Sequence, residues 1–122
     1  MRRHRILVVD DDRGIRQLYR AALMLAGFQV ETAEDGLGAL RRIDEGRPDL
    51  VVLDLHMPRI DGLAVLSELR ANSDTVNVPV VVVTGTEYQF APGDGGASTL
   101  LKKPCEPEEL ISVIEHHLRS AA

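Results

Sequence analysis

Residues 48–62 read PDLVVLDLHMPRIDG, and this stretch decides the fold. Its centre, LVVL, is an apolar run with no polar alternation, which is typical of a strand buried on both faces. The run ends on Asp54, and Pro58 then removes a backbone N–H and disfavours helix in the residue before it. The chain therefore leaves the strand through a rigid turn, and we expect Asp54 to be presented at the strand end.

Similar apolar runs alternate with segments of helical periodicity along the whole chain. Strands are expected at residues 5–10, 28–33, 48–55, 78–84 and 98–103. Helices are expected at residues 12–27, 34–46, 61–73 and 106–120. Continuous apolar strands separated by helices indicate a parallel sheet covered on both faces. We therefore predict a three-layer, doubly wound α/β fold with a five-stranded parallel sheet, and a single domain spanning residues 1–122.

The helix expected at residues 12–27 has a clear apolar stripe. The side chains expected on its buried face are Ile15, Leu18, Tyr19, Ala22 and Leu25. Asp12 is expected to cap its start, as a short carboxylate commonly does.

Composition narrows the classes of function. The formal net charge of -5 argues against a nucleic-acid-binding surface, which needs clustered Lys and Arg. The single cysteine, Cys105, excludes an internal disulfide and fits a reducing cytoplasm. The first apolar run is short and ends in three aspartates, so it is neither a signal peptide nor a membrane span. We expect a cytoplasmic protein that binds neither nucleic acid directly nor a membrane.

Polar side chains follow four of the five predicted strands. The first strand ends on Asp10 and Asp11, the third on Asp54, the fourth on Thr84 and the fifth on Lys103. In a parallel sheet these ends meet at one edge, where ligands of such folds bind. Each residue alone has an ordinary structural explanation, as a turn former, a strand-end residue or a solvated charge. Their convergence is what indicates a site.

Three carboxylates at one edge repel one another unless a cation neutralises them. Hard oxygen ligands suit Mg²⁺, which keeps several waters and often binds phosphate oxygens as well. A hydroxyl and an ammonium facing the same point are suited to a phosphoryl group. A carboxylate such as that of Asp54 can attack phosphorus and form an aspartyl phosphate.

Four motifs together resemble one family. They are VVDDD at residues 8–12, DLHMPRIDG at residues 54–62, VVVTG at residues 81–85 and LKKP at residues 101–104. In this order and at strand ends, they resemble the receiver domain of bacterial two-component response regulators, over nearly the whole chain. The resemblance implies a flavodoxin-like sheet of strand order 2-1-3-4-5.

The resemblance also implies a Mg²⁺ site. Asp10 and Asp11 match the acidic pair, with Asp11 the direct ligand and Asp10 acting largely through water. Asp54 and the backbone carbonyl of His56 complete the ligand set.

For the phosphoryl group, Asp54 matches the residue that accepts it from a phosphohistidine. Thr84 matches the hydroxyl that moves to hydrogen-bond a phosphoryl oxygen, and Lys103 matches the lysine that pairs with another. The implied protein is a signalling switch rather than an enzyme, although it catalyses its own phosphorylation and dephosphorylation. Its implied partners are a sensor histidine kinase or a histidine phosphotransfer protein, and a downstream protein that the sequence does not name.

Three features depart from the family pattern. Leu100 replaces the aromatic residue three positions before the lysine, so a ring flip cannot relay the hydroxyl shift. Cys105 stands where phenylalanine is usual, and we interpret it as a small buried apolar side chain. The stretch FAPGDGG at residues 90–96 is rich in helix-breaking proline and glycine. We predict that the fourth helix of the family is shortened there or replaced by a loop.

Two alternatives remain. A pseudo-receiver would act as a protein-binding module without phosphorylation, and Leu100 with the altered fourth helix favours it. A phosphatase of the haloacid dehalogenase-like family would also use an aspartyl nucleophile, but such enzymes usually place a second Asp where this chain has His56. The glycines of GDGG do not follow the first strand and lack the spacing of a nucleotide-binding loop.

Overall fold

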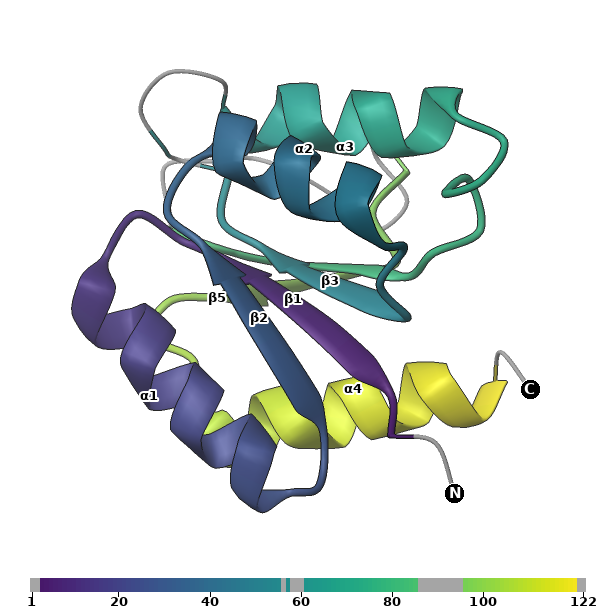
Figure 1. Ribbon diagram of the computed structural model, residues 1–122. Coiled ribbons are helices and arrows are strands. Elements are labelled where there is room, and N and C mark those ends of the chain that lie inside the picture. Colours follow the sequence, from purple (N-terminus) through teal and green to yellow (C-terminus); the bar gives the residue numbers. More distant parts are fainter. Residues whose placement is uncertain (1–2, 56, 58–60, 86–95, 121–122) are drawn as a thin grey trace.

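The computed structural model describes residues 3–55, 57, 61–85 and 96–120. Nine elements follow one another along the described chain (Figure 1). The strands are β1 (Arg5–Val9), β2 (Gln29–Ala33), β3 (Leu50–Leu53), β4 (Val80–Thr84) and β5 (Thr99–Lys102). The helices are α1 (Arg13–Leu25), α2 (Gly36–Glu45), α3 (Gly62–Ala71) and α4 (Pro107–Ser120).

The five strands form one parallel sheet in the order β2-β1-β3-β4-β5. The predicted sheet and its strand order are therefore confirmed. All residues of the inner strands β3 and β4 are buried, as are four of the five in β1, whereas the edge strands β2 and β5 are mostly half-exposed. This burial explains why the inner strands are continuous apolar runs.

Helices cover both faces of the sheet, which gives the predicted three layers. Helices α2 and α3 lie on one face, and α1 and α4 lie on the other (Figure 1). Each face has its own core, because successive strand residues point to opposite sides of the sheet. Leu53 and Val82 belong to the core that also contains Leu66, while Val52 and Val83 belong to the core that contains Leu110.

The predicted buried face of α1 is partly wrong. Leu18 is 49% exposed and Leu25 is 89% exposed, whereas Tyr19 and Leu23 are buried. The stripe that packs on the sheet runs through Ile15, Tyr19 and Leu23, at intervals of four residues. Several apolar residues compete for the inner face of this helix, and packing against the sheet and α4 selects among them.

Aspartates begin three of the helices. The side chains of Asp12, Asp35 and Asp61 accept hydrogen bonds from the N–H groups of Ile15, Gly38 and Ala64, respectively. The expected cap at Asp12 is thus confirmed. Asp61 fixes where α3 begins, close to the end of β3.

Residues 86–95 contain most of the FAPGDGG stretch and lie outside the described residues. The prediction that the fourth helix is shortened or replaced by a loop concerns this segment. The described chain resumes at Gly96, whose φ of 89° is strained for residues with a side chain. The Arg70 side chain donates to the Gly96 carbonyl at 2.8 Å and thereby links α3 to the start of β5. Of the helices described, none is sufficiently long and apolar to cross a membrane.

Candidate phosphoacceptor and metal site

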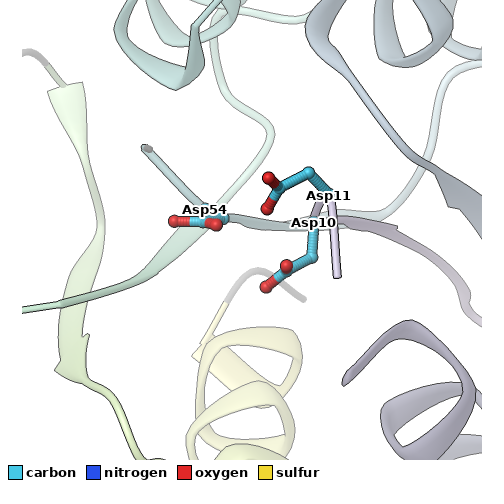
Figure 2. Close-up of side chains that lie close together, drawn as sticks. All are labelled: Asp10, Asp11 and Asp54. Atoms are coloured by element: carbon cyan, nitrogen blue, oxygen red, sulfur yellow. The ribbon is translucent and has the colours of Figure 1, made fainter. Parts of the chain in front are cut away.

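The carboxylates of Asp10, Asp11 and Asp54 gather at the carboxyl ends of β1 and β3 (Figure 2). One oxygen from each lies within 4.8 Å of the others. Asp10 and Asp54 are each only 3% exposed, whereas Asp11 is exposed. The predicted convergence of these three acids is confirmed. Through the exposed Asp11, the group is accessible to solvent.

Hydrogen bonds fix both the backbone and the side chain of Asp10. Its N–H donates to the Ala33 carbonyl at 3.1 Å, and its Oδ1 accepts from the Asp12 N–H at 2.9 Å. The Arg16 guanidinium donates to the Asp10 carbonyl at 2.8 Å. With Oδ1 engaged in this way, Oδ2 of Asp10 is the oxygen that faces the site.

Asp54 is fixed by contacts to its backbone. Its N–H donates to the Val9 carbonyl at 2.9 Å, which continues the pairing of β1 and β3 by one step. Gly62 packs directly against it, because a Cβ at this glycine would lie 2.4 Å from the Asp54 carbonyl oxygen and 2.5 Å from Leu55 Cα. The Gly62 N–H also donates to the Leu55 carbonyl at 3.2 Å. The start of α3 is therefore pressed against the backbone that carries Asp54.

Lys103 follows β5 and reaches the acids from beyond β4, at the same edge of the sheet. Its Nζ lies 2.9 Å from Asp10 Oδ2 and 3.2 Å from Asp54 Oδ2. Burial by itself would lower the pKa of the Lys103 ammonium, but the carboxylates of Asp10 and Asp54 outweigh this and raise the pKa above its ordinary value. Lys103 is therefore charged throughout the physiological range. The peptide bond between it and Pro104 is cis.

Thr84 ends β4 at the same edge of the sheet and is 1% exposed. Its hydroxyl oxygen has no hydrogen-bond partner among the described residues. A buried hydroxyl without a partner costs free energy, and such a group in a native structure calls for an explanation. A ligand bound at this edge would supply the missing acceptor.

The donor set fits a divalent cation. The group has three carboxylates and one ammonium, so negative charge remains uncompensated among its described members. Carboxylate oxygens are hard ligands of the kind that Mg²⁺ and similar ions bind. His56, whose backbone carbonyl the family resemblance adds to the ligand set, lies outside the described residues.

Two of the residues that depart from the family pattern lie within the described chain. Leu100 is half-buried and packs against the core beneath α2 and α3, and Cys105 is buried and free, as expected. His116 is exposed, and His117 contacts the Thr99 hydroxyl at the edge strand β5. Neither histidine belongs to the cluster of acids.

Sequence reasoning missed the residues that hold the site in place. Arg16 is one helical turn beyond the acids, and nothing in the motif indicates its bond to the Asp10 carbonyl. The sequence does not predict the close approach of Gly62 to Asp54 either. A glycine directly after the cap of a helix is only a weak signal for close backbone contact.

The chain is similar to known proteins over most of its length. Residues 6–115 match the family model described as the response regulator receiver domain. Among curated proteins, the response regulator MprA of Mycobacterium sp. (strain KMS) is 45% identical over 118 residues, which are 94% of this chain and 50% of the relative. MprA of Mycobacterium leprae (strain TN) is 43% identical over the same length. The chain spans about half the length of the curated relatives it matches.

Solved structures share the fold. The chemotaxis response regulator CheY4 of Vibrio cholerae has a TM-score of 0.87 and 31% identity, and the match covers 95% of this chain and 99% of that one. A CheY-like receiver domain protein from Methanospirillum hungatei JF-1 has a TM-score of 0.89 and 26% identity, covering 98% and 96% of the two chains.

Proposed function

This chain belongs to the response regulator receiver domain family, and from that premise we propose that it is a phosphoacceptor switch in a two-component phosphorelay. Asp54 receives a phosphoryl group from a phosphohistidine in a Mg²⁺-dependent reaction, and the modified protein then binds its partners differently. The observation that carries the proposal is the placement of the Lys103 ammonium 3.2 Å from Asp54 Oδ2. At the same edge of the sheet, the buried Thr84 hydroxyl at the end of β4 has no partner among the described residues.

The chemistry follows from the residues at the site. An Asp54 oxygen attacks phosphorus, the P–N bond to the donor imidazole breaks, and the nitrogen keeps its electron pair. The product is an acyl phosphate on Asp54. Lys103 is placed to offset charge on one phosphoryl oxygen, and Thr84 to donate a hydrogen bond to another.

Mg²⁺, bound by Asp10, Asp11, Asp54 and the backbone carbonyl of His56, would supply positive charge for the phosphoryl oxygens. Asp10 and Asp11 offer their oxygens close to the Asp54 carboxylate, so the residues that would hold the ion include the acceptor itself. The exposed Asp11 would hold the ion directly, and the buried, hydrogen-bonded Asp10 would act on it mainly through water.

The proposed role is regulatory. A sensor histidine kinase or a histidine phosphotransfer protein supplies the phosphoryl group in the cytoplasm, and a downstream protein reads the change. The protein catalyses at most its own phosphorylation and dephosphorylation, and has no separate substrate to turn over.

One observation favours a second candidate function, a pseudo-receiver that binds proteins without being phosphorylated. Leu100 is aliphatic and packs on the core, so it offers no aromatic ring to relay a shift of Thr84. In that case the residues of the site would be retained for folding alone.

Incubation with acetyl phosphate separates the two functions. We expect the intact mass to rise by one phosphoryl group when Mg²⁺ is present, and to stay constant with EDTA or in Asp54→Asn. Phosphoramidate, whose P–N bond resembles that of a phosphohistidine, should serve as well. A folded protein that gains no mass with either donor would reject the phosphoacceptor function and favour the pseudo-receiver.

A further inference from the structure

Tyr19 reaches from α1 to the segment that follows β5. The side chain is 2% exposed, and its hydroxyl donates to the Cys105 backbone carbonyl at 2.8 Å. The two residues are 86 positions apart in the sequence, and both belong to the core beneath α1 and α4. This hydrogen bond therefore connects the first helix to the backbone just beyond Lys103.

It is one of two hydrogen bonds that flank Lys103 along the chain. On the strand side, the Lys103 N–H donates to the Thr84 carbonyl at 2.8 Å, as the last step in the pairing of β4 and β5. On the other side, two residues further on, the Tyr19 hydroxyl holds the Cys105 carbonyl. Between the two bonds the Lys103 side chain extends to Asp10 and Asp54. The direction of this side chain depends on the backbone that both bonds fix.

The tyrosine hydroxyl is a dependable donor. Burial raises the pKa of the Tyr19 phenol well above its ordinary value, with smaller contributions from Cys105 and Asp10. The hydroxyl thus keeps its proton wherever the protein is folded. Cys105 contributes only a small buried side chain here, and the Tyr19 ring packs in the same cluster.

We propose that Tyr19 is a positioning residue for phosphoryl transfer: its hydroxyl holds the Cys105 carbonyl and thereby keeps the Lys103 ammonium directed at Asp54. The inference rests on the proposed function for its kinetic consequence, but not for its structural one. Tyr19 itself is a core residue of α1 and acts only through Lys103.

The test compares two deletions of a buried hydroxyl. Tyr19→Phe keeps the ring and removes only the oxygen. Thr75→Val is the matched control, because the Thr75 hydroxyl, on a residue 4% exposed, also donates to a backbone carbonyl, that of Leu69 at 2.7 Å. The urea midpoint of each variant establishes that it is folded and what its hydrogen bond contributes to stability.

The kinetic measurement is the rate of phosphorylation by acetyl phosphate at saturating Mg²⁺, followed by intact mass. Losing the net contribution of one hydrogen bond predicts a rate about fivefold lower in Tyr19→Phe. Thr75→Val should keep the unsubstituted rate. In a Lys103→Ala background, Tyr19→Phe should have no further effect, because two groups that act through one contact are not additive. Equal slowing in both backgrounds, equal slowing by Thr75→Val, or an unchanged rate in Tyr19→Phe would overturn the proposal.

A second measurement does not need phosphorylation. NMR relaxation of the side-chain Cε groups reports the order of Lys103 and of its exposed neighbour Lys102. We expect Tyr19→Phe to lower the order of Lys103 and to leave Lys102 unchanged. If the unsubstituted protein takes no phosphoryl group, the proposed function fails, and this measurement alone decides the positioning role: unchanged order at Lys103 rejects it.

Discussion

The Lys103 ammonium lies 3.2 Å from Asp54 Oδ2, although β4 separates the strands from which the two residues project. The residues are 49 positions apart in the sequence. Their contact depends on the parallel pairing of β3, β4 and β5, because the common carboxyl edge of these strands brings both side chains to one point.

Lys103→Ala tests the electrostatic role of this contact. Removing one preorganised charge from the reacting group should slow phosphorylation by acetyl phosphate about 100-fold. The rate is measured by intact mass at saturating Mg²⁺. Lys102→Ala is the control, since Lys102 is exposed and should keep the full rate. Similar rates for the two variants would show that Lys103 serves only to balance charge in the resting protein.

Gly62→Ala should be strongly destabilising. The added Cβ would lie 2.4 Å from the Asp54 carbonyl oxygen and 2.5 Å from Leu55 Cα, both backbone atoms that cannot move aside cheaply. We expect a loss of about 3 kcal/mol or more in the free energy of unfolding, measured with urea. Gly14→Ala, at an exposed position in α1, should change stability by less than about 1 kcal/mol. Comparable effects at the two glycines would contradict the close packing at Asp54.

Thr84→Val should weaken the response of the protein to Mg²⁺ and beryllofluoride without destabilising the fold. Because the hydroxyl has no partner among the described residues, its replacement by a methyl group of similar shape should cost less than about 1 kcal/mol or stabilise the fold. The amide shifts that Mg²⁺ and beryllofluoride induce should be smaller in this variant, since the hydroxyl would no longer reach the bound group. A large loss of stability would reveal that the hydroxyl is already engaged in the resting protein.

His117 should make stability depend on pH. Burial, and to a smaller extent the neighbouring His116, lower the pKa of His117. The unfolded chain then binds more protons than the folded one between the lowered value and the ordinary value of about 6.5, so the contribution of His117 to stability is lost as the pH falls through this window. The urea midpoint should drop less in His117→Gln than in the unsubstituted protein between about pH 7.5 and about pH 5. His4→Gln, at an exposed position, should behave like the unsubstituted protein, and an equal drop in all three would contradict this assignment.

Much of the sheet and of the site could be predicted because both depend on simple sequence patterns. The inner strands are uninterrupted apolar runs, and the carboxyl ends of parallel strands meet at one edge. The sequence alone therefore places Asp10, Asp54, Thr84 and Lys103 at that edge.

What could not be predicted depends on packing between distant segments. The predicted inner face of α1 is wrong at Leu18 and Leu25, because a helix with many apolar residues does not itself indicate which of them meet the sheet. The hydrogen bond from Tyr19 to Cys105 joins residues 86 positions apart, and no local sequence pattern predicts it.

The most direct test of the central claim is to map the phosphorylated residue among the clustered acids. The protein is incubated with Mg²⁺ and acetyl phosphate, reduced with borohydride, which converts an aspartyl phosphate to homoserine, and then digested for peptide mass analysis. We predict homoserine at position 54 and unmodified aspartate at positions 10 and 11, with no homoserine when Mg²⁺ is withheld. Homoserine at position 10 or 11, or none at position 54 in the folded protein, would contradict the assignment of Asp54 as the phosphoacceptor.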